Sequence, residues 1–204
     1  MIEKVDTKAK ILDTAEKLFG INGFESVSLR DITTEAGVNL AAVNYHFQSK
    51  DTLIDAVIAR RIEPINARRL ELLDSVEPGA AVESILHAFL QPVFAIQIQP
   101  LIPLMGRVMS NPNLFMDRLF NVHLAPLALR FSVALAAALP GLPREDVAWR
   151  LHFSVGVMTH TLLWGHIMPR MTNGLCSIDD REALLARTVQ FLAAGFRTPA
   201  SNLT

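Results

Sequence analysis

The chain has a single cysteine, Cys176, among its 204 residues. One cysteine excludes an intramolecular disulfide framework and any zinc site built from several cysteines, and it is typical of a reducing cytoplasm. The first stretch, MIEKVDTKAKIL, also lacks both the apolar segment of a secretory signal and the arginine-rich pattern of a transit peptide. We therefore expect no targeting segment here and a cytoplasmic location.

An excess of basic residues is missing as well. The formal net charge is −1, and residues 1–60 hold seven Lys and Arg against nine Asp and Glu, a balance of −2. A nucleic-acid-binding domain usually shows a basic face. If this chain binds DNA, it must depend on a few well-placed cations and on dimerisation, and acids such as Asp13, Glu16 and Glu35 must lie on helix faces away from the DNA.

Half of the residues are hydrophobic and the mean hydropathy is +0.30, so a membrane span has to be considered. The best candidate, residues 124–142, carries Arg130 near its middle, together with Pro126 and Pro140. An arginine at the centre of a membrane helix costs about 2.5–3.5 kcal/mol. We therefore expect a buried helix or a dimer interface here, and no membrane partner.

Strand-like alternation of apolar and polar residues is not found after residue 75, and earlier the apolar residues recur at helical spacing. The chain is therefore predicted to be all-α. We expect helices over residues 7–21 and 50–75, with a kink in the second at Pro64. Further helices are expected over residues 80–98, 101–110, 112–122, 124–139, 143–168 and 179–197.

Two short helices joined by a tight turn are predicted within residues 26–50. Ser28 can cap the first helix, Asp31 completes a capping-box-like pair, and Gly37 suits the left-handed backbone after the last turn. Asn39 can cap the second helix. Its predicted buried face is Leu40, Val43 and Phe47, and its other face carries Ala41, Ala42, Asn44, Tyr45 and His46.

Such a pair of helices matches a helix-turn-helix, whose second helix enters the major groove of DNA. From periodicity and capping alone, an ordinary helical hairpin of a bundle remains an alternative.

Residues 8–53 resemble the DNA-binding domain of the TetR family of transcriptional regulators. The matching residues are Ile11, Leu12, Ala15, Leu18, Phe19, Gly23, Phe24, residues 28–32 (SLRDI), 36–38 (AGV) and 45–47 (YHF), Lys50 and Leu53. The resemblance implies an all-α dimer. Its N-terminal three-helix helix-turn-helix domain would occupy residues 1–55, and a C-terminal helical bundle for effector sensing and dimerisation would occupy residues 56–204.

The resemblance implies phosphate contacts for Tyr45, His46 and Lys50, which lie at the end of the second helix and the start of the next. Ser28 can offer its hydroxyl, and the helix that it caps can offer amides, to another phosphate.

Base edges are expected to be read mainly by Arg30 and Asn44. A guanidinium suits guanine O6 and N7, and an amide suits adenine. Ala41 and Ala42 can contact thymine methyl groups, and Asn39 completes the predicted DNA-binding set. Many relatives carry glycine at the position of Ala41 and an aromatic residue at that of Asn44, so no operator sequence follows.

Two of these assignments have structural alternatives. Arg30 can instead pair with Asp31 or Glu35, and Tyr45 can simply pack against its neighbours.

The segment 80–170 is rich in apolar and sulfur-containing side chains, most of which are expected to form a core. Polar residues in these helices are more informative, because an unpaired buried charge is costly. They either face solvent or converge on an acidic group of a ligand. We expect an effector pocket, with Arg107 at its mouth, lined by Met105, Arg107, Met109, Phe120, His123, Phe131, Phe153, His160 and Trp164.

The last two long helices, 143–168 and 179–197, are expected to form a homodimer interface, although both can equally be core. Small residues that permit close helix packing are Ser154, Gly156, Ala193, Ala194 and Gly195. A two-fold dimer matches a palindromic operator in double-stranded DNA.

Histidines in the C-terminal half do not predict a metal site. His152, His160 and His166 lack the i, i+4 spacing that places two ligands on one helical face. We also find no trustworthy pair of nucleophile and base, so we expect no metal, no cofactor and no enzymatic activity.

The sequence thus favours a cytoplasmic repressor that a small hydrophobic effector releases from DNA. A fatty-acyl or aromatic effector is expected, because NLAAVNYHF is similar to a subset of the family that includes regulators of fatty-acid metabolism. The competing hypothesis is a lipid-binding or interaction bundle in which the helix-turn-helix is only structural.

Overall fold

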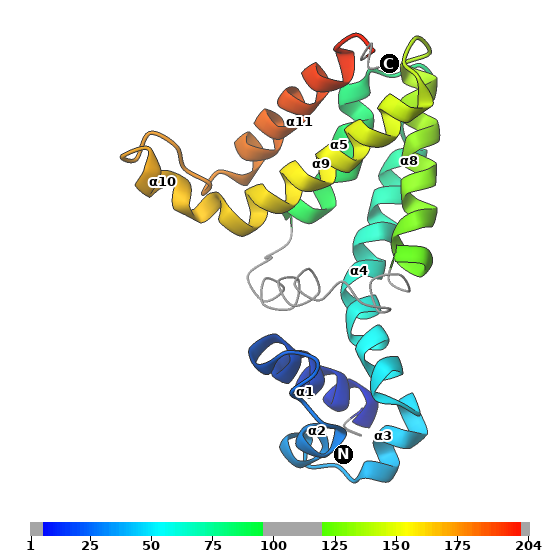
Figure 1. The fold of residues 1–204 in the computed structure, drawn as a ribbon, viewed down its shortest axis with the longest axis vertical. Helices are drawn as coiled ribbons and strands as arrows, with labels where there is room; N and C mark the ends of the chain where they lie inside the picture. Colours follow the sequence, from blue (N-terminus) through cyan, green and yellow to red (C-terminus); the bar gives the residue numbers. More distant parts are fainter. Residues whose placement is uncertain (1–5, 96–119, 201–204) are drawn as a thin grey trace, which may run out of the picture. The chain divides into compact units, whose positions relative to one another are not determined.

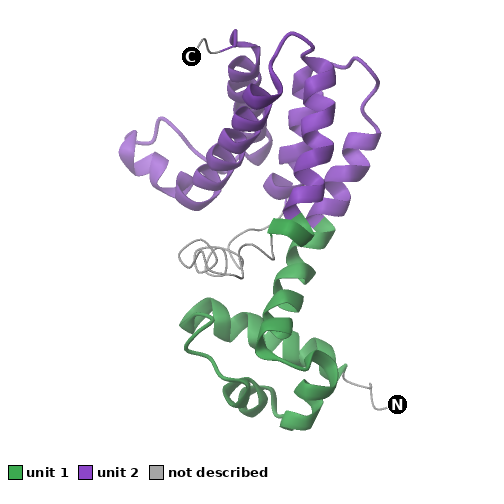
Figure 2. Cartoon of the chain, turned by 45° about the vertical axis from the view of Figure 1, so that its right-hand side comes forward, with its two compact units in different colours: residues 1–64, 99–123 green, residues 65–98, 124–204 purple. Residues whose placement is uncertain are grey.

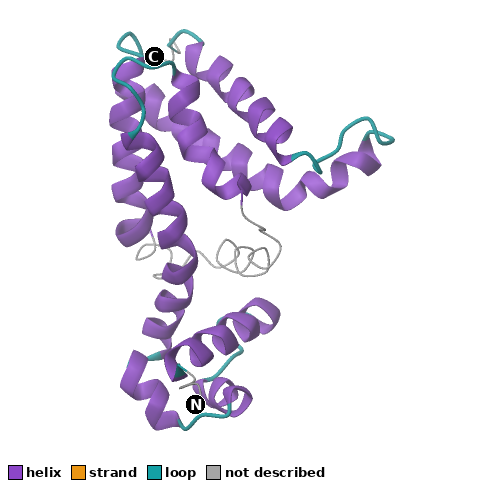
Figure 3. Cartoon of the chain, turned by 180° about the vertical axis from the view of Figure 1, so that it is seen from behind, coloured by secondary structure: helices purple, strands orange, loops and turns teal. Residues whose placement is uncertain are grey.

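The computed structural model describes residues 6–95 and 120–200, and every regular element within these ranges is a helix (Figure 3). The all-α class predicted from the sequence is therefore confirmed. The helix predicted over residues 101–110 lies outside the described residues, as does most of the one predicted over 112–122.

Three helices come first, α1 (Thr7–Asn22), α2 (Leu29–Ala36) and α3 (Leu40–Phe47) (Figure 1). Each is preceded by a polar side chain that accepts hydrogen bonds from N–H groups of the first turn. Asp6 accepts from Lys8 and Ala9, Ser28 from Asp31, and Asn39 from Ala42. These caps begin each helix where the sequence predicted.

The apolar stripes of α1–α3 and the first turns of the next helix form one small core. Its buried members are Ile11, Leu12, Ala15, Phe19, Val27, Ile32, Val43, Phe47, Leu53, Ile54, Val57 and Ile58. Leu40, which was predicted to be on the buried face of α3, is instead 40% exposed. It is the first residue of α3, so no preceding helical turn covers it.

The long helix α4 (Lys50–Asp74) contains Pro64 and continues through it. Proline has no N–H, so the carbonyl of Arg60, four residues earlier, loses its helical partner at this point. The chain divides at this proline into two compact units (Figure 2). The described residues of the first are 6–64 and 120–123, and those of the second are 65–95 and 124–200. The functional boundary between residues 55 and 56 stays a prediction.

The second unit is a bundle built from the end of α4 with α5 (Val82–Ala95), α8 (Ala125–Ala138), α9 (Arg144–Trp164) and α11 (Arg181–Arg197). Helix α5 packs against α8 and α11, and α9 packs against the same two helices. Three short elements accompany them, η2 (Phe120–Leu124), η3 (Gly165–Ile167) and α10 (Met168–Met171). The centre of the bundle includes Leu86, Leu90, Phe131, Leu135, Ala193 and Phe196.

One described helical stretch, Phe120–Ala138, is long and apolar enough to cross a membrane, judged by length and composition alone. Leu127, Phe131 and Leu135 from this stretch are buried in the core of the second unit, and Arg130 forms an ion pair with Asp74. The core helix of a bundle passes the same test, so this stretch gives no argument for a membrane.

Candidate nucleic-acid interface

The start of α2 is held by a reciprocal capping box. Both the backbone N–H and the hydroxyl of Ser28 donate to Asp31 Oδ2, at 2.8 and 2.7 Å, and the Asp31 N–H donates back to Ser28 Oγ at 3.2 Å. The backbone bond first, and the hydroxyl bond second, hold the pKa of Asp31 below its usual 3.8. Asp31 is therefore ionised at neutral pH, and the Ser28 hydroxyl already has an acceptor. A Ser28–phosphate contact stays a prediction, and it requires that hydroxyl to leave Asp31.

Arg30 lies exposed on α2, beside this cap. The acids that were its alternative partners are both engaged, because Asp31 binds Ser28 and Glu35 Oε1 lies 2.9 Å from Lys17 Nζ. The hydrogen bond from Lys17, and then its charge, lower the pKa of Glu35. Arg30 forms no ion pair with any residue that the structure describes, so its guanidinium remains available for a base edge or a phosphate.

A left-handed residue separates the two helices. Gly37 has φ 61° and ψ 40°, and the N–H groups of Gly37 and Val38 close the helix on the carbonyls of Thr34 and Thr33 at 3.2 and 3.0 Å. This backbone conformation is easily reached only by glycine. Two residues later Asn39 Oδ1 accepts from the Ala42 N–H at 2.8 Å. The cap uses the Asn39 oxygen, which leaves its NH2 group for the predicted DNA contact.

The outward face of α3 is narrower than predicted. Ala41, Asn44 and Tyr45 are exposed, and Tyr45 is 83% exposed. Ala42 is half-buried and packs against the core, and His46 is half-buried beside the Tyr45 ring, with 5.0 Å between ring centres. Residues 42 and 46 are one helical turn apart and flank the buried stripe, so the prediction that Ala42 shares the face of Ala41 was wrong.

Lys50 lies at the start of α4, just after Ser49, whose hydroxyl accepts from the Thr52 N–H at 3.1 Å. The Lys50 ammonium donates to the Glu25 carbonyl oxygen at 3.3 Å. An ammonium has three donors, so this bond leaves two for a phosphate. The predicted phosphate-binding residues therefore lie on both sides of one helix junction, with Tyr45 and His46 near the end of α3 and Lys50 at the start of α4.

Two acids of the first unit, Asp13 and Glu16, are neutralised by ion pairs between α1 and α4. Arg60 contacts Asp13 at 2.6 Å and Glu16 at 2.5 Å, and Arg61 contacts Glu16 at 2.7 Å. Partial burial alone would lower the pKa of Arg60, but its bonds to Glu16 and Asp13 outweigh burial and raise it. These acids therefore do not present free negative charge, in agreement with the constraint set by the net charge.

The predicted effector pocket is not assembled within the described part of the chain. Met105, Arg107 and Met109 lie outside it. Phe120, Phe153 and Trp164 are 50%, 58% and 54% exposed, and His160 is exposed as well. These exposed side chains do not enclose a cavity within the described residues, and their assignment to the pocket stays a prediction.

The remaining two predicted pocket residues are at least partly buried. Phe131 is fully buried and its ring centre lies 5.1 Å from that of Phe89. His123 Nδ1 lies 3.9 Å from Glu63 Oε1 in the first unit. The structure therefore supports only Phe131 as an interior residue of the second unit.

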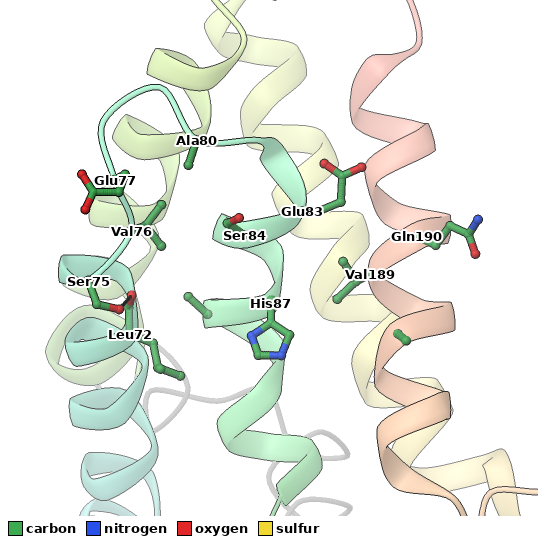
Figure 4. Close-up of a pocket in the computed structure, with 12 residues that line it drawn as sticks. Leu72, Ser75, Val76, Glu77, Ala80, Glu83, Ser84, His87, Val189 and Gln190 are labelled. Carbon is green, nitrogen blue, oxygen red and sulfur yellow. Dashed lines mark hydrogen bonds between the residues drawn. The ribbon is translucent and has the colours of Figure 1, made fainter.

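A surface groove of about 830 Å³ lies in the second unit between the end of α4, the start of α5 and α11 (Figure 4). None of the predicted pocket residues lines it. Its polar lining includes Ser75, Glu77, Glu83, Ser84 and His87. The Glu83 carboxylate accepts from Arg197, a bond that lowers the pKa of Glu83. The rest of the lining is mainly apolar and includes Leu72, Val76 and Val189.

Sequence reasoning missed one buried charged residue, Arg69, which is 6% exposed. Its spacing was an available signal, because Ile62, Asn66, Arg69, Leu73 and Val76 recur at helical intervals on one stripe of α4. Within the described residues, no group of three or more His, Cys, Asp or Glu side chains is arranged to hold a metal ion.

Two protein-family models match the chain. The model described as "Bacterial regulatory proteins, tetR family" matches residues 11–57, and the model described as "Tetracyclin repressor-like, C-terminal domain" matches residues 87–195. The first coincides with the capped helices of the first unit, and the second covers most of the helical bundle.

Curated relatives are similar over shorter stretches. The HTH-type transcriptional regulator UidR of Escherichia coli (strain K12) is 31% identical over 116 residues, which are 54% of this chain and 56% of UidR. The probable HTH-type transcriptional regulator YttP of Bacillus subtilis (strain 168) is 32% identical over 93 residues, which are 46% of this chain and 43% of YttP. The chain thus spans about half the length of the curated relatives it matches.

The fold is shared more widely. The structure of the fatty acid degradation regulator FadR from Bacillus halodurans superposes with a TM-score of 0.68. The match covers 96% of this chain and 98% of that one, at 16% identity. An identity this low shows a common fold and nothing more.

Proposed function

Because the chain belongs to the TetR family of bacterial transcriptional regulators, which are not enzymes, we propose that it is a ligand-responsive repressor. In this proposal a homodimer binds a palindromic operator in double-stranded DNA in the cytoplasm. A small hydrophobic effector then binds the second unit and releases the DNA. The effector must prefer one of two states of the dimer, because equal affinity for both would shift nothing.

The observation that carries the DNA-binding proposal is the exposure of α3. Tyr45 is 83% exposed, whereas Val43 and Phe47 on the same helix are at most 2% exposed. Within the described residues an aromatic side chain this exposed contributes little packing beyond its edge contact with the His46 ring, and this favours a DNA contact over the alternative that Tyr45 simply packs. Tyrosine hydroxyls bind phosphate oxygens and so set the register of a protein on DNA.

The dimer proposal is supported by an apolar face on α9 and α11. Trp149, Phe153, Trp164 and Phe191 are all more than half exposed, and the rings of Trp149 and Phe153 stack at 5.8 Å. Exposed apolar side chains that gather on one part of a surface mark an interaction site. The small residues Gly156, Ala194 and Gly195 are exposed as well, but Ser154 and Ala193 are fully buried inside the unit, so those two belong to its core.

A fatty-acyl or aromatic effector remains our proposal for the ligand. Its support is the apolar interior of the second unit, together with the fold that the chain shares with a fatty acid degradation regulator. Helix α4 continues from the first unit into the second through Pro64, so we propose that it transmits the effector signal to the recognition helices.

DNA binding is tested by fluorescence anisotropy on DNA from upstream of the protein's own gene, across a salt series. Tyr45→Ala and Lys50→Ala should each weaken specific binding, and Lys50→Ala should reduce the slope of log K against log salt by about one. Lys17→Ala is the matched control, because it removes the same charge from a lysine that pairs with Glu35.

If Lys17→Ala weakens binding as much as Lys50→Ala, general charge and not a phosphate contact explains the effect. If the wild-type protein shows no preference for any DNA sequence, the alternative of a lipid-binding or interaction bundle replaces the repressor.

A further inference from the structure

Arg69 lies on the part of α4 that belongs to the second unit, and its side chain is almost fully buried. Its Nε donates to the Phe89 carbonyl oxygen at 2.7 Å, and its guanidinium carbon lies 4.4 Å from the centre of the Phe89 ring. Burial lowers the pKa of Arg69 to about 10, so the group is still charged at neutral pH. The protein therefore holds a full positive charge inside this unit.

The outer edge of this guanidinium has only weak partners. Nη1 lies 3.4 Å from Asn66 Oδ1, and Nη2 lies 3.3 Å from the Met158 sulfur, which is a poor acceptor. Arg69 pairs with no carboxylate among the residues that the structure describes. A buried charge is normally paired, because removing it from water without a counter-ion is costly.

The neighbouring arginine shows the contrast. Arg68 is exposed and lies 2.8 Å from Glu71. Among the described residues, an acid therefore pairs with the exposed arginine and none pairs with the buried one.

A structural role explains only one side of Arg69. The bond from Nε to the Phe89 carbonyl oxygen ties α4 to α5. Within the described part of the chain, the parallel N–H groups of Nη1 and Nη2 have no strong acceptor.

We propose that the Nη1–Nη2 edge of Arg69 anchors the carboxylate of an effector that carries an apolar body. The inference rests on the proposed ligand-responsive function and specifies its ligand class, an organic monoacid. A guanidinium binds a carboxylate through two parallel hydrogen bonds. No second cation in the ranges that the structure describes contacts this edge. The single positive charge therefore suits a carboxylate, with one negative charge, better than a doubly charged phosphate group.

The surroundings fit such a ligand. Met158 is flexible enough to move its thioether away from Nη2. The interior beside the charge is apolar, because Phe89 and Phe131 are 4% and 0% exposed and their ring centres lie 5.1 Å apart.

The test compares acids with their isosteric amides. Thermal unfolding and titration calorimetry of the wild-type protein are measured with octanoate against octanamide, and with phenylacetate against phenylacetamide. At least one acid should bind and raise the Tm, and its amide should bind about ten- to hundredfold more weakly.

Variants then locate the anchor. Arg69→Met should abolish the preference for the acid. Arg69→Lys should retain part of it, because lysine keeps the positive charge but cannot form two parallel hydrogen bonds with a carboxylate. Arg68→Met, one residue away on the surface, should bind the acid like the wild type. Far-ultraviolet circular dichroism and operator binding check that each variant is folded.

Equal binding of acid and amide by the wild type, no binding of either acid, or an undiminished acid preference in a folded Arg69→Met would each overturn the carboxylate anchor. Operator binding by the wild type is measured separately. If the protein binds its operator and does not distinguish acid from amide, the anchor fails and the repressor proposal stands. If it does not bind DNA, the repressor fails whatever the acids do.

Discussion

Asp31 illustrates how single side chains position the recognition helix. Its carboxylate accepts two hydrogen bonds from Ser28, one from the backbone and one from the hydroxyl, and in return its N–H bonds the Ser28 oxygen. Two residues three positions apart were enough to predict this box, because its hydrogen bonds are local. The partial burial of Ala42 was not predictable in the same way, because it depends on which other helix covers that position.

Asp31→Asn should make the stability of the protein less dependent on pH in the acid range. The pKa of Asp31 is depressed in the folded protein, so its stabilising contribution is present above the usual value of 3.8 and is lost as the pH falls through the folded value. The Tm of the wild type, followed from about pH 7 to about pH 3, should therefore fall more steeply than that of Asp31→Asn.

Ser28→Ala is the matched variant for this measurement. It keeps the backbone N–H that is the larger cause of the pKa shift, so it should retain most of the wild-type pH dependence. Identical curves for Asp31→Asn and the wild type would contradict the assignment.

Gly37→Ala should destabilise the protein by about 1–2 kcal/mol in urea unfolding, because alanine is strained at φ 61°. Gly141→Ala is the control: Gly141 has no positive φ and a Cβ there meets nothing within 4 Å. Its unfolding free energy should change by no more than about 0.5 kcal/mol. Equal losses in the two variants would show that the left-handed turn is not the cause.

Helix α4 joins α1 through charges that are far apart in the sequence. Glu16 holds both Arg60 and Arg61, and Asp13 holds Arg60. Periodicity predicted the bounds of both helices, because those depend on caps and apolar spacing. It could not predict these pairs, since the partners lie 44 to 47 positions apart in the sequence and meet only when α1 has folded against α4.

Glu16→Gln should destabilise the first unit by about 1–3 kcal/mol, because it leaves two partly desolvated guanidinium groups without their shared carboxylate. Glu71→Gln breaks an exposed pair with Arg68, three residues away on the same helix, and should cost about 1 kcal/mol or less. Chemical denaturation measures the free energy of unfolding of both variants. If Glu16→Gln loses no more stability than Glu71→Gln, the α1–α4 ion pairs contribute no more than an exposed surface pair.

At the scale of the whole molecule, the two helices proposed for dimerisation could be selected from the sequence, but their contact face could not. Small side chains were the sequence signal for the interface, but they do not distinguish Ser154, which is buried in the unit, from Gly156, which is exposed. The exposed rings of Trp149, Phe153 and Phe191 identify the outward side, and they do so only once the inner sides of α9 and α11 are seen to be filled.

Phe191→Glu should convert the dimer to a monomer in sedimentation velocity, because it places a charge on the proposed apolar interface. Operator affinity should fall with it, since a single helix-turn-helix unit with few free cations binds weakly. Val133→Glu is the control, because Val133 on α8 is 62% exposed, close to the 67% of Phe191, and lies off the proposed interface. A dimeric Phe191→Glu protein would place the interface elsewhere.

The distribution of the fluorescent residues has a practical consequence. The only tyrosine of the chain, Tyr45, lies on the recognition helix, and both tryptophans, Trp149 and Trp164, lie exposed on α9. Under the proposed function, tyrosine emission and tryptophan emission then respond to different events, operator contact and subunit association. The unlabelled protein therefore carries separate optical signals for its two kinds of binding, and each can be followed while the other is titrated.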